Sequence, residues 1–262
     1  MQLEGAVVVI TGAAGGIGSA LARRFAAEGT AGLVLTDLPG TALDDLAAEL
    51  GDGAVAVAGD VTDEALHHRL VATAEERFGP VDLYCSNAGT GAAGGLQASL
   101  DDWDRVWRVN TLAHVLAARA VLPSMLDRGR GWLLQTASAA GLLINLGEPA
   151  YTATKHAAVG LAEWLSATYR HRGIGVSCLC PMGVDTAMLR TATDDGVAGN
   201  VVRGAGEVLS PDVVADCVVA GLAAESFLIL PHPDVSRFVQ GKAADSDRWL
   251  TAMNRVQQKL EA

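Results

Sequence analysis

The sequence has little charge, and most of that charge is of one sign. Charged residues make up 19% of the 262 residues, with 30 acidic against 19 basic side chains and a formal net charge of -11. Such a surface repels phosphate backbones and anionic lipid headgroups, which argues against nucleic-acid and membrane partners and favours a small molecule. With 50% hydrophobic residues and no low-complexity polar stretch, extensive disorder is also disfavoured.

Several motifs that would define other classes of protein are missing. The apolar runs are too short to span a bilayer, and the N-terminal residues MQLEG do not resemble a signal peptide, so a cytoplasmic location is expected by default. The four cysteines show no CxxC spacing, which predicts reduced, buried thiols. His67, His68 and His232 lack HExxH-type spacing, so no metal site is expected.

Short apolar segments alternate with longer helical patterns along the chain. Residues 6–10 form a continuous apolar run, which is typical of a strand buried on both faces of a parallel sheet. Similar segments follow at 32–36, 54–58, 81–86, 131–136, 175–180 and 227–230. Helical patterns lie between them at 17–28, 41–50, 63–78, 100–125 (whole or broken), 151–169 and 211–223.

This alternation predicts an α/β fold: a Rossmann-like, doubly wound, seven-stranded parallel sheet flanked by helices, in a single domain over 1–262. The cofactor half is placed at about 1–130 and the catalytic and substrate half at about 131–262. A lid is expected at 183–206 and a C-terminal helical tail at 236–260. Trp249, Leu250, Met253, Val256 and Leu260 recur at helical spacing in that tail, which we interpret as core or interface packing.

A glycine-rich turn, TGAAGGIG over residues 11–18, joins the first strand to the first helix. Glycines are needed there because side chains would block the tight turn and the approach of backbone amides to a pyrophosphate. No Lys-Ser or Lys-Thr follows, so a dinucleotide fits better than a mononucleotide P-loop.

The second strand ends in Asp37, about 20 residues beyond the last glycine, where a carboxylate can bind the adenosine ribose hydroxyls and would repel a 2′-phosphate. This favours NAD over NADP, although Asp37 could instead cap a loop. Asp60 and Val61 close the third strand, and Asn87, Ala88 and Gly89 close the fourth, at the same edge of the sheet. Each of these could also be ordinary turn chemistry.

Tyr151 and Lys155 lie four residues apart on a predicted helix and so share one face. A neighbouring ammonium stabilises phenolate, and we expect it to lower the pKa of Tyr151 from about 10 toward working pH. An exposed i,i+4 pair is the alternative. Ser138 follows the strand at 131–136 and can hold a substrate oxygen. Asn110 is a poor helix former inside a helical stretch, and its alternative role is a hydrogen bond that eases a helix break.

In this ordered set of motifs, from about residue 6 to 186, the sequence resembles the short-chain dehydrogenase/reductase family, in its short single-domain NAD(P)-dependent branch. The resemblance implies a catalytic tetrad of Asn110, Ser138, Tyr151 and Lys155. In it Tyr151 transfers the proton, Lys155 binds the nicotinamide ribose and tunes Tyr151, Ser138 positions the substrate oxygen, and Asn110 helps hold a relay water.

The resemblance also implies the cofactor contacts. These are the turn residues Thr11, Gly12, Gly16, Ile17 and Gly18, then Asp37 at the ribose, Asp60 and Val61 beside adenine, and Pro181, Gly183, Val184 and Thr186 after the sixth strand. Val184 and Thr186 are expected to touch the nicotinamide amide. The family resemblance and the apolar helices imply a homotetramer, with a homodimer as the alternative.

The substrate is expected to be a hydrophobic or alicyclic secondary alcohol or its ketone. Leu142, Leu143, Met182, Met188 and Leu189 suggest an apolar pocket, while Glu148 could bind a polar group or be an ordinary helix-start carboxylate. The alternatives are a sugar or polyol dehydrogenase of the same family and a catalytically silent NAD-binding sensor or scaffold. A hydrolase built on Ser138 is disfavoured because the GxSxG elbow is missing.

Overall fold

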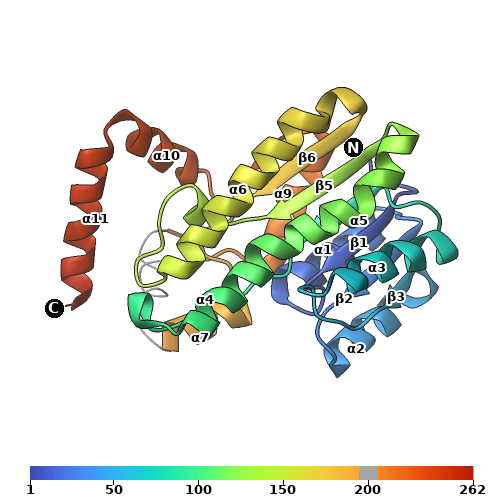
Figure 1. Ribbon diagram of the computed structural model, residues 1–262, viewed down its shortest axis with the longest axis horizontal. Coiled ribbons are helices and arrows are strands. Elements are labelled where there is room, and N and C mark those ends of the chain that lie inside the picture. The colour runs from blue at the N-terminus through green and yellow to red at the C-terminus, as the bar shows by residue number, and fades with distance from the viewer. Residues whose placement is uncertain (195–205, 262) are drawn as a thin grey trace.

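The computed structural model describes residues 1–194 and 206–261 and is built around one parallel sheet (Figure 1). The sheet has seven strands in the order β3-β2-β1-β4-β5-β6-β7, which confirms the predicted fold class. The strands are β1 Val7–Thr11, β2 Gly32–Thr36, β3 Ala54–Ala56, β4 Leu83–Ser86, β5 Gly131–Thr136, β6 Ile174–Leu179 and β7 Leu228–Ile229. The third and seventh strands are shorter than predicted.

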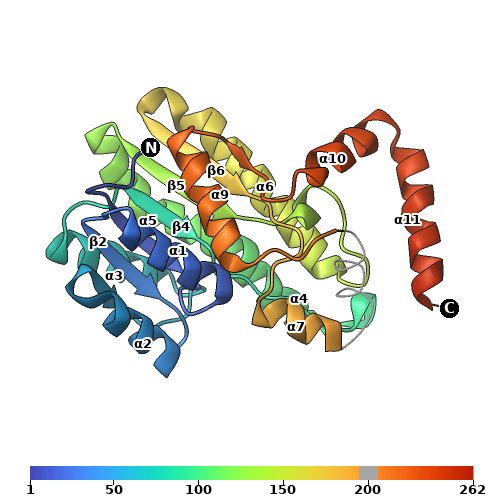
Figure 2. The same cartoon turned by 180° about the vertical axis from the view of Figure 1, so that it is seen from behind.

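Helices cover both faces of the sheet (Figures 1 and 2). On one face lie α3 Glu64–Arg77, α5 Ala113–Arg128 and α6 Pro149–Tyr169, and on the other α1 Gly16–Ala27, α2 Thr41–Leu50 and α9 Pro211–Ala223. Side chains of the interior strand β1 alternate between the two faces, because Val7 and Val9 pack with the first group while Val8 and Ile10 pack with the second. Burial of both faces explains why the strands are continuous apolar runs.

The strand order places the binding crevice. The chain proceeds from β1 outward to β2 and β3, then returns to the other side of β1 to lay down β4. The connections leaving β1 and β4 therefore diverge, and the carboxyl ends of these neighbouring strands open a crevice of the kind that binds ligands in such sheets. Thr11 links the two strand ends that border this crevice. Its hydroxyl accepts hydrogen bonds from the main-chain amides of Asn87 (2.9 Å) and Ala88 (3.1 Å).

The long helical stretch predicted at 100–125 is interrupted. It consists of α4 Leu100–Trp107, a π-helical segment Arg108–Leu112, and α5, which carries Pro123 and ends at Gly129. By length and composition Leu100–Arg128 could cross a bilayer, but 56% of its most apolar window is buried inside the fold. It therefore behaves as a core helix.

The C-terminal tail forms two helices, α10 Asp234–Ala244 and α11 Ser246–Glu261, and α11 lies away from the α/β body (Figures 1 and 2). Of the two interpretations of this tail, core packing is wrong, since Leu250 is 53% exposed, and interface packing stays a prediction. Instead, Trp249, Met253 and Val256 line a large cavity. The Lys242 ammonium anchors α10 by donating a hydrogen bond to the Leu142 carbonyl at 2.8 Å.

Candidate active site

A cavity of about 1660 Å³ runs along the carboxyl edge of the sheet, from the glycine-rich turn to Tyr151 and on to α11. This exceeds the roughly 300–1,000 Å³ of an ordinary small-molecule site, so a dinucleotide and a second molecule can share it. Most of the predicted site residues line this cavity: Gly12, Gly16, Ile17, Gly18, Asp37, Asp60, Val61, Asn87, Ala88, Gly89, Ser138, Glu148, Tyr151, Lys155, Pro181, Met182, Val184, Thr186, Met188 and Leu189.

Four predicted residues lie just behind the cavity wall: Thr11, Asn110, Leu142 and Gly183. Leu142, predicted as a substrate contact, does not line the cavity, and its partly buried side chain packs against the core. The next two residues, Leu143 and Ile144, line the cavity instead. Gly183 contributes its carbonyl, which accepts hydrogen bonds from Leu209 (2.9 Å) and His232 (3.1 Å).

The glycine-rich turn is packed too closely for side chains. Gly12 has φ +65°, and a Cβ added there would lie 2.8 Å from Ala88 Cα. A Cβ at Gly16 would lie 2.7 Å from Thr186 Cγ2, so the turn and the segment after β6 meet across the cavity. These glycines form a cradle in which the main chain can approach a ligand closely. Any larger residue at these positions would clash with the neighbouring segments.

Asp37 faces the cavity at the end of β2 and is held there by two backbone amides. Its carboxylate accepts hydrogen bonds from Ala14 (2.9 Å) and Leu38 (2.8 Å), so it also caps the loop, as the alternative interpretation held. Within the described residues, the cations that line the cavity come from α4, the π-helical segment, α6 and α11: Arg105, Arg108, Lys155 and Lys259. The cavity wall around Asp37 is therefore acidic without a compensating cation.

Ser138, Tyr151 and Lys155 meet at the middle of the cavity. α6 begins at Pro149, two residues before its predicted start, and presents Tyr151 and Lys155 on one face, with the Lys155 Nζ 5.5 Å from the Tyr151 ring centroid. Lys155 is buried and donates a hydrogen bond to the Thr136 carbonyl at 3.0 Å. The Ser138 hydroxyl accepts a hydrogen bond from Ala140 N at 3.1 Å, which fixes the turn after β5. An exposed surface pair is thereby excluded.

The expected lowering of the Tyr151 pKa is wrong for the ligand-free protein. Loss of hydration raises the pKa of Tyr151 to about 12, and the charge of Glu148 adds to this, while the hydrogen bond with Ser138 opposes it. The same loss of hydration lowers the pKa of Lys155 to about 8. Loss of hydration thus disfavours the charged form of both side chains, and for Tyr151 it is the largest influence on the pKa.

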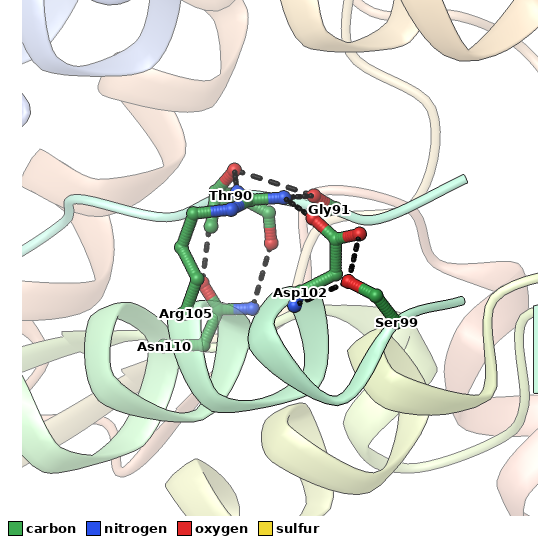
Figure 3. Close-up of polar contacts among 6 residues, drawn as sticks. All are labelled: Thr90, Gly91, Ser99, Asp102, Arg105 and Asn110. Carbon is green, nitrogen blue, oxygen red and sulfur yellow. Dashed lines mark hydrogen bonds and ion pairs between the residues drawn. The ribbon is translucent and has the colours of Figure 1, made fainter. Parts of the chain in front are cut away.

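Asn110 lies in the π-helical segment, and its side chain is used structurally (Figure 3). Its Oδ1 accepts a hydrogen bond from Thr90 N, and its Nδ2 donates to Thr90 O, both at 2.8 Å. Nδ2 also donates to Thr154 Oγ1 at 3.2 Å. The predicted helix break is thus confirmed together with its hydrogen bond, and Asn110 ties the segment after β4 to α6.

Two further residues, to which the sequence patterns gave no role in the site, position segments of the cavity wall. His232 accepts a hydrogen bond from Met182 N (3.1 Å) through Nδ1, and its Nε2 lies 3.1 Å from Gly183 O and 3.2 Å from Glu207 O. Arg105 donates hydrogen bonds to Thr90 Oγ1 (2.8 Å) and Gly91 O (3.2 Å) (Figure 3). Both residues make hydrogen bonds to partners outside their own helix or loop, so no local sequence pattern predicts these contacts.

The predicted lid at 183–206 falls only partly within the described residues, since 195–205 lie outside them. Its described part contains α7 Ala187–Asp194. Val184, Thr186, Met188 and Leu189 from this part line the cavity. Opening and closing of the lid stays a prediction.

The fold and cavity define a dinucleotide-binding type of α/β protein, and comparisons narrow the class. The family model of short chain dehydrogenases matches residues 6–196. A 1-deoxy-11-beta-hydroxypentalenate dehydrogenase of Streptomyces exfoliatus is 40% identical over 241 residues, covering 89% of this chain and 86% of that protein. The meso-2,3-butanediol dehydrogenase of Serratia marcescens is 34% identical over 256 residues, covering 94% and 98%.

A solved structure gives the same result. The crystal structure of a short chain dehydrogenase/reductase from Burkholderia phymatum in complex with NAD matches with a TM-score of 0.86 at 32% identity, covering 94% of this chain and 96% of that chain. The chain belongs to the short-chain dehydrogenase/reductase family, which confirms the resemblance. Its reaction class is oxidoreduction of a CH–OH group.

Proposed function

We propose that this protein transfers a hydride between NAD(H) and a bulky, largely apolar secondary alcohol or its ketone, with Tyr151 as the acid/base. One observation carries the proposal: Tyr151, Lys155 and Ser138 line the same cavity as the glycine cradle and Asp37. A proton-transferring group and the proposed dinucleotide site therefore share one cavity.

The residues present fit the dinucleotide. A Cβ at Gly12 or Gly16 would fill the cradle, and the remaining turn residues, Ile17 and Gly18, line the same wall. Pyrophosphate would be held by the turn, the adenosine ribose by Asp37, and adenine by Asp60 and Val61. Asn87, Ala88 and Gly89 would flank the ribose that Lys155 binds, with Pro181, Gly183, Val184 and Thr186 at the nicotinamide. When bound, NAD supplies the two-electron acceptor for the hydride of the carbinol carbon.

Side chains of the protein transfer the proton. In alcohol oxidation the Tyr151 oxygen takes the proton of the substrate hydroxyl, so that the alcohol loses one proton and one hydride and becomes a ketone. The Ser138 hydroxyl holds the substrate oxygen beside Tyr151. The Lys155 ammonium favours the phenolate form, and Asn110 holds the surrounding backbone and, with it, a relay water. In ketone reduction the Tyr151 phenol returns the proton.

The preference for NAD over NADP is supported by charge. Asp37 would face the 2′-hydroxyl of the adenosine ribose, and a phosphate there would meet a carboxylate with no cation beside it. Replacing Asp37 by Ser should raise the KM for NAD and lower that for NADP. Unchanged constants for both cofactors would show that Asp37 does not bind the ribose.

An apolar substrate is supported by the outer part of the cavity. Apart from Glu148, the walls beyond Tyr151 are formed mainly by apolar side chains: Leu143, Ile144, Met182, Met188, Leu189, Trp249, Met253 and Val256. The two relatives described above are named as dehydrogenases of 1-deoxy-11-beta-hydroxypentalenate and of meso-2,3-butanediol, both hydroxylated molecules. A large alicyclic alcohol would fill this space, and polyols turned over far better than such alcohols would refute the assignment.

The decisive experiment follows NADH absorbance while the protein meets a panel of secondary alcohols and ketones. Wild type should turn over alicyclic alcohols with NAD, and Tyr151→Phe should lose at least about 100-fold in kcat while still binding NAD. Tyr169→Phe, at the far end of the same helix, is the matched control. NAD binding without turnover of any alcohol or ketone would favour a sensor or scaffold.

We further propose that the protein is a cytoplasmic homo-oligomer, with a tetramer favoured over a dimer. The exposed indoles of Trp107 on α4 (48%) and Trp164 on α6 (56%) support self-association, because large apolar side chains are seldom left in water together. Light scattering after size-exclusion chromatography tests the state, and a monomer at micromolar concentration would refute it.

A further inference from the structure

Glu148 is a carboxylate on the wall of an otherwise apolar part of the cavity. It precedes Tyr151 by three residues, at the start of α6, and is half-buried. Although it occupies the position before the first helical residue, its side chain makes no capping hydrogen bond. As a helix-start carboxylate, Glu148 therefore contributes the interaction of its charge with the helix dipole and no capping hydrogen bond.

The Glu148 carboxylate is held in one orientation by a neighbour. Asn145 Nδ2 donates a hydrogen bond to Oε2 at 2.8 Å, and Asn145 is itself fixed by a hydrogen bond from its main-chain N–H to Thr152 Oγ1 at 2.9 Å. In the described part of the chain no hydrogen bond or ion pair engages Oε1. Oε2 is thus held in place by Asn145, whereas Oε1 is available to another hydrogen-bond donor.

The free oxygen points toward Gly91, which is itself clamped. A Cβ on Gly91 would lie 2.7 Å from Glu148 Oε1, so a larger residue there would displace the carboxylate from its present position. Arg105 fixes the Gly91 carbonyl at 3.2 Å, and its charge is already paired with Asp102 at 3.0 Å (Figure 3). Arg105, the cation that contacts Gly91, is therefore committed elsewhere, and burial raises the pKa of Glu148.

A partly desolvated carboxylate with an unused oxygen on a cavity wall is placed to accept a hydrogen bond from water or from a ligand that enters the cavity. We propose that Glu148 Oε1 accepts a hydrogen bond from a second hydroxyl of the substrate, adjacent to the carbinol that Tyr151 oxidises. The substrate class is then an alicyclic vicinal diol or, in reduction, the corresponding hydroxyketone. This inference rests on the proposed function and specifies its substrate.

The same contact would assist catalysis. The charge of Glu148 contributes to the raised pKa of Tyr151 and so opposes the phenolate. A hydroxyl donating to Oε1 disperses that charge and eases ionisation of Tyr151. A diol should therefore gain in kcat as well as in KM over the matching mono-alcohol.

The test compares cyclohexanol with cis- and trans-1,2-cyclohexanediol, by initial NADH formation, in wild type, Glu148→Leu and Glu148→Gln. Wild type should favour one diol over cyclohexanol by about 10- to 100-fold in kcat/KM, the range of a hydrogen bond to a charged group. Glu148→Leu should bring the ratio of diol to cyclohexanol kcat/KM close to one, and Glu148→Gln, which retains an acceptor, should keep part of the preference. Glu163→Leu, exposed on the same helix, is the control.

Two results overturn the inference. If turnover of diol and mono-alcohol falls equally in Glu148→Leu, with thermal stability and NAD binding unchanged, Glu148 positions Tyr151 without contacting a second hydroxyl. If the variant leaves both unchanged, the free oxygen has no ligand. Failure of the proposed function is distinct, because wild type would then form no NADH from any alcohol, and the inference would fall with it.

Discussion

Replacing Lys155 by Met should make the ligand-free protein more stable at neutral pH while abolishing its activity. Lys155 is 2% exposed, and burial lowers its pKa from 10.5 to about 8. The difference of about 2.5 pH units corresponds to about 3 kcal/mol of unfavourable free energy for holding the ammonium in the folded state. Removing the charge also removes its hydrogen bond to the Thr136 carbonyl, which costs about 1–2 kcal/mol.

The net gain at pH 7 is therefore about 1–2 kcal/mol, or a rise in Tm of roughly 2–8 °C. The gain should vary with pH in a defined direction. Between pH 8 and 10.5 the unfolded chain keeps the Lys155 proton while the folded wild type has lost it, so the wild type gains stability relative to the variant as pH rises. Above about pH 10.5 only the lost hydrogen bond remains, and Lys155→Met should be the less stable protein.

Thermal unfolding followed by circular dichroism, without NAD, at pH 7, 8, 9 and 10 measures this difference directly. Lys242→Met is the matched control, because Lys242 also donates to a backbone carbonyl, at 2.8 Å, but keeps contact with solvent. It should be slightly destabilised at every pH. A Tm difference for Lys155→Met that is independent of pH, or a loss of stability at pH 7, would refute the reasoning.

Three other perturbations test separate parts of the site. With the Tyr151 pKa raised to about 12, kcat/KM for alcohol oxidation should rise with pH between 6 and 9 while that for ketone reduction stays level; level profiles in both directions would exclude Tyr151 as the base. His232→Phe removes the hydrogen bonds of the imidazole to Met182 N and Gly183 O. The KM for NAD should therefore rise about tenfold, with a smaller change in kcat. The control His156→Phe, at an exposed position, should change neither constant. Truncation after Asp245 removes the cavity wall formed by α11 and should raise the KM of large alicyclic alcohols but not of butan-2-ol; an equal effect on both would argue against a wall.

The local patterns were sufficient for most of the fold. The bounds of β2, β5, α2 and α9 agree with the predicted 32–36, 131–136, 41–50 and 211–223, because each is bordered by glycine, proline or a capping residue and has a clear apolar period. β3 ends at Ala56 and not at residue 58. The chain beyond it is held by single backbone hydrogen bonds from Val57 N to Leu35 O in β2 and from Gly59 N to Asp37 O just after β2, and apolar character does not reveal this change.

The parts of the site that the sequence could not give depend on tertiary surroundings. The YxxxK spacing correctly places Tyr151 and Lys155 on one face, yet the direction of the Tyr151 pKa follows from burial by segments far away in the chain. The helical spacing of Trp249, Met253 and Val256 correctly predicts a helix, but not that its apolar face borders a cavity. Arg105 appears in the sequence as an ordinary surface arginine, and only the fold brings it to Thr90.

The π-helical segment at Arg108–Leu112 makes the site sensitive to a change in length at this point. A π turn holds one residue more than the α-helix around it, so removing Val109 would let α4 and α5 join as one regular helix with nearly unchanged phase. The wide turn that carries Asn110 would disappear, and with it the hydrogen bonds of the Asn110 side chain to Thr90 and Thr154. The segment after β4 would then no longer be tied to α6, although every strand stayed in place. A single deletion at this point would therefore damage the catalytic half of the molecule before the cofactor half.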